Sequence, residues 1–164
     1  QLCWPTVVPL YDAWMVDRKL LYMLQPALES NVWSALQQAA KSGAPIQARV
    51  VAEWYSQILH CVAYLHWSRV AHRDIKVENL VVAQGGRQLK MCDFGSAARL
   101  DEPGATGDED GVPFVRCDVT TPRITAPEVF KRRTHFAASD CWSVGATAYE
   151  MLTLSPLFPA NEPL

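Results

Sequence analysis

The sequence predicts an α+β fold in which a short β-rich beginning is followed by a mainly helical remainder. Two β-rich runs, residues 6–14 and 19–24, are separated by a short polar turn, which is typical of a hairpin. Apolar residues recur at three- and four-residue spacing over 47–66, which predicts a buried-face helix of about five turns. A further buried helix is expected at 139–152. Strands therefore come first and most helices later.

Composition is that of an ordinary globular protein. The 164 residues are 49% apolar and 20% charged. Chains of this length bury roughly 70% of their unfolded surface, so length by itself predicts one complete domain. The net charge of −2 gives no reason to expect nucleic acid or an anionic membrane as a partner. No apolar run approaches the length of about 18 residues that a membrane-spanning helix needs, and no signal peptide is visible.

The cysteines indicate a reducing compartment. There are five of them, an odd number, and none of them has Cys-x-x-Cys spacing. We interpret Cys3, Cys61, Cys92, Cys117 and Cys141 as reduced thiols of an intracellular protein. A cytoplasmic location is expected, with the nucleus as an alternative.

Local signals divide the middle of the chain. Asn31 is placed to cap a helix over 32–41 that stops at Gly43 and Pro45. After the long helix, residues 80–82 and 88–92 form a second predicted hairpin around a turn at 84–87. His60 and His66 lie near the end of the long helix, and without a third ligand at suitable spacing we expect them to be structural or solvated.

The densest chemistry lies in residues 71–82, which read Ala-His-Arg-Asp-Ile-Lys-Val-Glu-Asn-Leu-Val-Val. Asp74, Lys76 and Asn79 can point into one small volume if this segment is a loop pinned by the apolar strand 80–82. A carboxylate, an ammonium group and an amide that converge there suit a hydroxyl nucleophile, a phosphate and a divalent cation. The second hairpin would also return Asp93 beside Asn79, and two oxygen ligands so placed suit Mg²⁺.

These residues resemble the catalytic loop of eukaryotic protein kinases, H-R-D-L-x-x-x-N, with Ile75 in place of the leucine. Asp-Phe-Gly at 93–95 and Ala-Pro-Glu at 126–128 follow in the family's order and spacing, and the three motifs together are a highly specific signal. The runs at 76–79 and 92–97 are also similar to the Numb-associated kinases, although Cys-Asp-Phe-Gly-Ser occurs in glycogen synthase kinase-like proteins as well.

The resemblance covers nearly the whole chain and implies part of a protein kinase domain. Residues 1–24 look like the end of the N-lobe, with two strands of its sheet, and residues 25–30 look like the hinge. Residues 31–164 look like an incomplete helical C-lobe. In this fragment the chain begins in mid-pattern and stops before the last helices of that lobe.

The resemblance also implies roles for the site residues. Asp74 would orient the substrate hydroxyl and accept its proton, and Lys76 would neutralise the γ-phosphate. Asn79 and Asp93 would hold Mg²⁺ that bridges the phosphates of ATP. Thr121 matches the threonine that contacts the catalytic Asp and Lys. Lys76, two residues after Asp74, matches the pattern of serine/threonine kinases. The implied partners are therefore ATP and a protein substrate.

The adenine of ATP would be held by the hinge. Its backbone near Pro26 and Leu28 would hydrogen-bond the base, and Val81 would pack under the ring. Gln25 stands where the residue that guards the deeper pocket is expected. These assignments follow from the resemblance alone.

The chain departs from the family pattern at several positions. Thr120 replaces a glycine and Ile124 replaces an aromatic residue, so the peptide-docking surface differs. There is no Gly-rich loop, no strand Lys and no helix with its partner Glu, and the arginine that pairs with Glu128 is expected beyond Leu164. Two hypotheses follow: a fragment of a working kinase, inactive alone, or a pseudokinase that acts as a scaffold. The complete set of four site residues favours the kinase.

Residues 96–125 correspond to the family's activation segment. Its acidic middle, 101–111, has no large apolar residue. Composition favours a solvated insertion, and the alternative is that its acids dock on Arg73 and mimic a phosphate. Because Arg73 would otherwise be an unpaired cation, we expect an upstream activating kinase to phosphorylate Thr120 or, second, Thr106.

Two further expectations concern the last third of the chain. The second buried helix resembles the central helix of the family's large lobe, and this resemblance implies that Asp140, at its start, bonds the backbone of residues 72–73. The basic run 131–133 is either a solvated turn or a surface facing an acidic substrate or the acidic stretch.

Overall fold

The computed structural model describes residues 4–101, 106–107, 111–117 and 121–159, and it confirms the α+β class. In chain order, the elements are β1 (Asp12–Val16), β2 (Leu20–Leu24), β3 (Ser30–Asn31), α1 (Val32–Ser42), α2 (Ala48–Trp67), β4 (Val70–Ala71), η1 (Val77–Asn79), β5 (Leu80–Ala83), β6 (Gln88–Met91), η2 (Phe94–Ser96), β7 (Ala98–Arg99), β8 (Thr106–Gly107), β9 (Pro113–Arg116), η3 (Pro122–Ile124), α3 (Pro127–Arg132), β10 (Thr134–Phe136) and α4 (Ala137–Thr153).

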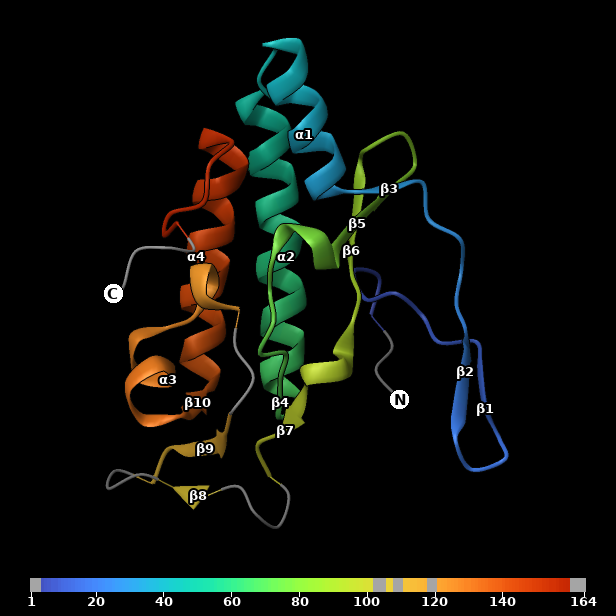
Figure 1. Cartoon of the computed structure of the whole chain (residues 1–164), viewed down its shortest axis with the longest axis vertical. Coiled ribbons are helices and arrows are strands. Elements are labelled where there is room, and N and C mark those ends of the chain that lie inside the picture. The colour runs from blue at the N-terminus through green and yellow to red at the C-terminus, as the bar shows by residue number, and fades with distance from the viewer. Residues whose placement is uncertain (1–3, 102–105, 108–110, 118–120, 160–164) are drawn as a thin grey trace.

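Helix α2 runs through the middle of the molecule, with α1 and α4 packed beside it (Figure 1). Its apolar positions face the core, where Ile58, Cys61 and Leu65 are completely buried. They pack together with Val144 and Met151 of α4 in one hydrophobic cluster. The periodicity of 47–66 therefore predicted this helix and its buried face to within a residue at each end.

Helix α1 begins and ends where its sequence predicts. Asn31 is the N-cap, because its Oδ1 accepts a hydrogen bond from the backbone N–H of Ser34 at 2.8 Å. The helix ends at Gly43, whose φ of 66° is the left-handed conformation that glycine adopts without strain.

Strands β5 and β6 form the second predicted hairpin and position the catalytic loop. They pair antiparallel in a register that sets Leu80 opposite Met91 and Val82 opposite Leu89. These four side chains are buried against the helices. The intervening turn is held by α2, because the indole N–H of Trp54 donates to the Gly86 carbonyl at 2.8 Å. The loop that precedes β5 is thereby fixed to the helical core.

The prediction of a single strand over residues 6–14 is wrong for its first half. β1 pairs with β2 only from Asp12 to Val16, and residues 6–8 lie instead beside β6. There, Val8 N–H donates to the Met91 carbonyl at 2.9 Å and Met91 N–H donates to the Thr6 carbonyl at 2.7 Å. Pro9, which has no N–H, separates the two segments. Residues 6–8 therefore belong with the helical part.

The β1–β2 hairpin stands apart from the helices (Figure 1). Every residue of both strands is exposed, including Trp14 at 47%, Met15 at 61% and Met23 at 60%. A two-stranded sheet with no cover on its faces is marginal in water. The apolar side chains of this hairpin are therefore available to pack against further polypeptide.

The last third of the chain builds a small sheet next to α3 and α4. Strand β9 lies between β8 and β10, with His135 of β10 opposite Val115 of β9. Strand β7 pairs with β4, directly before the catalytic loop. Helix α4 covers 137–153 and includes the predicted 139–152.

In the part of the chain that the structure describes, no helix combines the length and apolar character needed to cross a bilayer. Among the described residues, Cys61, Cys92, Cys117 and Cys141 form no disulfide bond with one another, and Cys3 lies outside the described residues. Burial raises the pKa of the Cys61 thiol to about 11.

Candidate active site

The loop between β4 and β5 brings three of the predicted side chains together with Thr121. The Lys76 ammonium lies 2.6 Å from Asp74 Oδ2. The Thr121 hydroxyl donates to Asp74 Oδ1 at 2.8 Å, and Lys76 Nζ donates to that same hydroxyl at 3.3 Å. Asn79 Nδ2 donates to the Asp74 carboxylate at 3.0 Å and to its carbonyl at 2.9 Å. Asp74 is thus the centre of a preorganised polar cluster.

Asp74 is held in its ionised form. Partial burial pushes the pKa of this carboxyl upward, but hydrogen bonds from Lys76, Thr121 and Asn79, with the Lys76 charge, bring the pKa below its ordinary value. The side chain keeps 15% of its surface accessible. An ionised, partly accessible carboxylate can accept a hydrogen bond from an incoming hydroxyl.

His72 lies in the protein interior, next to this cluster. The side chain is completely buried, and burial lowers its pKa, so the imidazole is neutral. Its Nδ1 accepts from the N–H of Asp74 at 3.3 Å, and its Nε2 donates to the Cys92 carbonyl at 3.2 Å. Its ring also packs against Phe94 with centroids 4.9 Å apart. His72 therefore ties Asp74 to the chain that leads into Asp93.

Arg73 is not the unpaired cation that the sequence led us to expect. Its Nε donates to the Ser96 carbonyl, and its Nη1 donates to the Arg116 carbonyl at 3.0 Å. The guanidinium thus has neutral backbone oxygens as partners. Arg73 therefore does not require an anion to be paired. Thr120 and most of the acidic stretch lie outside the described residues, as does the side chain of Thr106.

Asp140 of α4 holds the catalytic loop, as the family resemblance implied. Its carboxylate accepts from the backbone N–H of His72 and of Arg73, each at 2.9 Å. His66 and His135 add Nε2 contacts at 3.0 and 3.1 Å. Burial alone would raise the pKa of Asp140, but the hydrogen bonds from the two histidines hold it well below its ordinary value. His66 is therefore structural, as expected, and His135 is a contact that the sequence did not reveal.

Asp93 follows β6 and stands on the same hairpin as Asn79. The Cys92 N–H donates to the Asn79 carbonyl at 2.9 Å, which sets the two segments side by side. Asp93 adopts a left-handed conformation, with φ of 60°, and its Oδ1 accepts from the Gly95 N–H at 3.2 Å. A Cβ at Gly95 would stand only 3.1 Å from that oxygen, so a larger residue would crowd the carboxylate.

The ligand atoms here fit Mg²⁺. Asn79 and Asp93 offer an amide oxygen and a carboxylate, which are hard oxygen ligands. Both hydrogen bonds described for the Asn79 amide use its nitrogen, so neither occupies the oxygen. Within the described residues, no group of three or more His, Cys, Asp or Glu side chains is arranged for a metal. Mg²⁺ does not need such a group, because it keeps several waters and takes substrate phosphates as ligands.

An apolar cavity of about 460 Å³ adjoins Asp93, between the β1–β2 hairpin and the residues after β6. Its size is within the range of small-molecule sites. Its lining comprises Val7, Val8, Leu10, Leu21, Met23, Gln25, Asp93, Phe94 and Gly95. Gln25 lines the cavity as expected of a residue near the deeper pocket, whereas Pro26, Leu28 and Val81 are not part of the lining. The adenine contacts of these three residues stay predictions.

A second charged cluster beside the loop was not predicted. The Arg123 guanidinium pairs with Glu78 and lies 3.7 Å from Glu150 of α4. Burial and the charge of Glu78 raise the pKa of Glu150, and Arg123 opposes this rise. The Glu78 Oε2 atom is buried without a hydrogen-bond partner. The three residues are far apart in sequence, so only the fold could reveal the cluster.

Comparison with known proteins agrees with this geometry. A sequence model of the protein kinase domain matches residues 1–163. Cyclin-dependent kinase F-4 of Oryza sativa subsp. japonica is 32% identical over 158 residues, which are 96% of this chain and 31% of that protein. cGMP-dependent protein kinase 2 of Mus musculus is 34% identical over 159 residues, 96% of this chain and 19% of that protein.

A third relative, probable cyclin-dependent kinase 8 of Dictyostelium discoideum, is 29% identical over 161 residues, 95% of this chain and 41% of that protein. The chain therefore spans less than half the length of these three curated relatives. The match to the domain nevertheless extends over almost all of the chain, and it agrees with the three motifs and the cluster around Asp74. The chain belongs to the protein kinase domain family.

Proposed function

We propose that the protein carrying this chain is a serine/threonine kinase that transfers the γ-phosphate of ATP to a protein hydroxyl. The observation that carries the proposal is the cluster around Asp74. Its carboxylate is ionised, partly accessible and fixed by three neighbours, Lys76, Asn79 and Thr121. Phosphoryl transfer depends almost entirely on positioning and electrostatic stabilisation, which such a cluster supplies.

Each residue takes a distinct part in the proposed reaction. Asp74 orients the substrate hydroxyl and accepts its proton. Lys76, 2.6 Å from that carboxylate, places a positive charge where the transferred phosphate gathers negative charge. Thr121 bridges both groups and fixes their separation. Lys76 also supports the serine/threonine class.

Asn79 and Asp93 are the residues that we propose to hold Mg²⁺. The ion, when bound with ATP, neutralises charge on the phosphates during transfer. The two residues contribute oxygen ligands from the two chain segments at the open end of one hairpin, whose register is fixed by the buried pair Leu80 and Met91. We further propose that Pro26, Leu28 and Val81 contact the adenine.

A pseudokinase scaffold is the alternative function, and a transfer assay separates the two. The full-length protein would be incubated with γ-labelled ATP and mixed Ser-, Thr- and Tyr-containing peptides, with Mg²⁺ or with EDTA. We expect label on serine or threonine only in the presence of Mg²⁺. Nucleotide binding without any transfer would instead favour the scaffold.

The 164-residue chain alone should not phosphorylate peptides at a measurable rate, and it should self-associate. These 164 residues contain neither the family's Gly-rich cover nor its strand Lys, so the phosphates would be held by half of the usual clamp. The bare edges and apolar faces of the β1–β2 hairpin favour association. Turnover assays and a sizing column test this. A well-behaved monomer with kinase-like turnover, lost on Asp74→Asn, would show that the missing part is dispensable.

Control by an upstream kinase is a separate proposal. Thr120 and Thr106 are the candidate sites, although Arg73 already bonds backbone carbonyls. A phosphate would therefore have to compete with the Ser96 and Arg116 carbonyls for the guanidinium. Such competition favours the anion, because a phosphate can form a bidentate pair of opposite charge with the guanidinium, whereas a carbonyl oxygen carries no net charge.

A further inference from the structure

Asp140 divides its hydrogen bonds evenly between its two oxygens. Oδ2 accepts from the His72 N–H and from His66 Nε2, and Oδ1 accepts from the Arg73 N–H and from His135 Nε2. Each oxygen thus receives one backbone donor of the catalytic loop and one histidine. Because the carboxylate is completely buried, the two histidines fix its orientation without competition from water.

The loop that Asp140 holds is under local strain. Arg73 has a φ of 69°, a left-handed conformation that is unfavourable for a residue with a side chain. Such a conformation persists only where the surroundings enforce it. The enforcing contacts are the bond from the Arg73 N–H to Asp140 and the two bonds from the guanidinium. Asp74 is the next residue, so its direction depends on these contacts.

The two histidines come from different parts of the fold. His66 belongs to the last turn of α2, which packs on α4 and cannot move independently of the core. His135 belongs to β10, a three-residue strand whose partner is β9. Strand β9 lies in the activation segment, close to its C-terminal end. Of the two histidine contacts to Asp140, only the one from His135 can respond to the activation segment.

Strand β9 also contacts Arg73 directly. The Arg116 carbonyl at the end of β9 accepts from Arg73 Nη1, while Arg116 itself is opposite Thr134 in the β9–β10 pair. The pair is held further by the rings of Phe114 and Phe136, whose centroids are 5.5 Å apart. A shift of β9 against β10 would therefore affect the catalytic loop in two ways, through the contact between His135 and Asp140 and through the hydrogen bond between Arg116 and Arg73.

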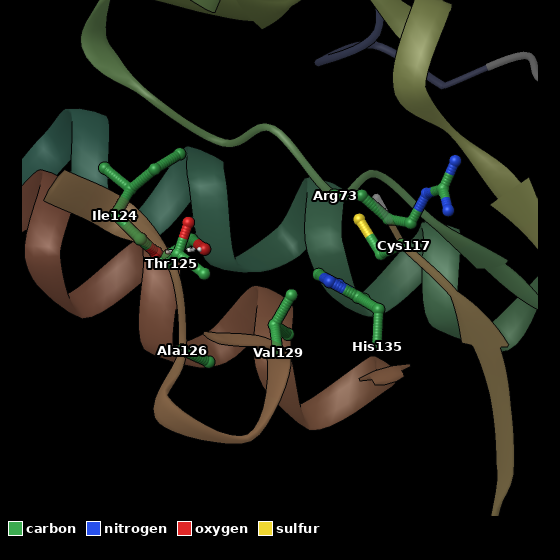
Figure 2. Close-up of a pocket in the computed structure, with 8 residues that line it drawn as sticks. Arg73, Cys117, Ile124, Thr125, Ala126, Val129 and His135 are labelled. Carbon is green, nitrogen blue, oxygen red and sulfur yellow. Dashed lines mark hydrogen bonds between the residues drawn. The ribbon is translucent and has the colours of Figure 1, made fainter. Parts of the chain in front are cut away.

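A small pocket leaves His135 room to respond. Figure 2 shows Arg73, Cys117 and His135 gathered at one end of it, with Ile124, Thr125 and Ala126 at the other end. The accessible space is about 10 Å³, which is the volume of a single water site. The His135 side chain is therefore not packed tightly on every side.

We propose that His135 is a positioning residue that couples the β9–β10 pair to the catalytic loop through Asp140. When the pair is in the register described above, His135 completes the carboxylate's set of donors, and Asp140 holds residues 72–73 so that Asp74 points into the site. When β9 is displaced, the donor is withdrawn and the loop relaxes. This inference rests on the proposed kinase function for its effect on turnover.

The first test is a set of single variants in the full-length protein. His135→Phe keeps a ring but removes the donor, and it should lower kcat about tenfold with the KM for ATP unchanged, the scale typical of coupling between sites. His135→Gln, which can place an N–H near the position of Nε2, should restore most of the rate. Thermal unfolding of each variant would verify that it is folded. Equal losses in the Phe and Gln variants would overturn the role of the donor.

The second test is a pair of double-mutant cycles with Phe114→Ala, which loosens the β9–β10 pair. His135→Phe and Phe114→Ala should be non-additive in kcat, because both weaken the contact between His135 and Asp140. His66→Phe is the matched control: it removes the equivalent donor from the rigid helix, and it should combine with Phe114→Ala additively within about twofold. Additivity in both cycles, or non-additivity in both, would overturn the coupling.

Hydrogen exchange at the amides of residues 72 and 73 separates this inference from the proposed function. Phe114→Ala should speed their exchange in the wild-type background and speed it clearly less in the His135→Phe background, where only the Arg116–Arg73 hydrogen bond still links β9 to the loop. This result would support the coupling even in a protein that transfers no phosphate. Unchanged exchange in Phe114→Ala would overturn the coupling even in an active kinase.

Discussion

Asp93→Asn in the full-length protein should abolish Mg²⁺-dependent phosphoryl transfer. The substitution keeps the size of the side chain but removes the only carboxylate that we assign to the metal, leaving two amides as protein ligands. The hydrogen bond from the Gly95 N–H to this side chain can persist, so the local backbone should not change. Initial rates measured over a range of Mg²⁺ concentrations would show whether additional metal restores any activity.

Asp74→Asn should reduce turnover by about 10² to 10⁴-fold, the range in which general acid–base groups contribute, while nucleotide still binds. The Asp74 contacts are to Lys76, Asn79 and Thr121, and none of the predicted adenine contacts is among them. A nucleotide-binding titration beside the turnover assay would separate the two effects.

Glu53→Gln serves as the control for both variants, because Glu53 is an exposed carboxylate of α2 that pairs with Arg49. It should leave kcat and KM unchanged. Near wild-type turnover in either Asp93→Asn or Asp74→Asn would contradict the role assigned to that residue.

Asp140→Asn should lower the free energy of unfolding by about 3–5 kcal/mol, as expected when one member of a buried charged network is removed. Four donors converge on the carboxylate, two on each oxygen. An amide would turn its own NH₂ group toward two of them. Urea unfolding followed by tryptophan fluorescence would measure the loss. Asp101→Asn, at an exposed position paired with Arg99, should leave the midpoint unchanged.

The difference in the free energy of unfolding between wild type and Asp140→Asn should depend on pH in a defined direction. The pKa of Asp140 is lowered in the folded protein from an ordinary value of 3.8. The stabilisation is therefore fully present above the ordinary value and is lost progressively as pH falls from that value through the lowered one. This difference in the free energy of unfolding should stay constant from neutral pH down to about pH 5 and narrow once pH falls below the ordinary pKa of the carboxyl. A difference in the free energy of unfolding that closed between pH 8 and pH 6 would contradict the assignment to the Asp140 carboxyl.

The catalytic loop could be predicted because its chemistry is local. Asp74, Lys76 and Asn79 stand within a few residues of one another, and the apolar strand after them fixes their direction. The cap at Asn31 and the stop at Gly43 are likewise local signals. Asp140 could be placed because the family resemblance indicated its partner.

Other contacts could not be predicted because they involve the backbone or depend on long-range pairing. The partners of Arg73 are carbonyl groups, which every residue possesses, so no side chain marks them in the sequence. His135 reaches Asp140 through the position of a three-residue strand. The strand predicted from Thr6 was wrong because its apolar pattern continued across Pro9, whereas Val7 is buried in the main hydrophobic cluster and forms a bridge with Met91 of β6.

The two carbonyl contacts of Arg73 also have a consequence for the length of the chain between them. Ser96 and Arg116 stand on either side of the acidic stretch, and the guanidinium fastens both to the same point. The entropy lost on closing a flexible loop grows only with the logarithm of its length, so doubling the loop costs about 0.6 kcal/mol. Insertions and deletions within the acidic stretch 101–111 are therefore cheap, while the strands on either side of it, β7 and β9, keep the geometry around Asp74.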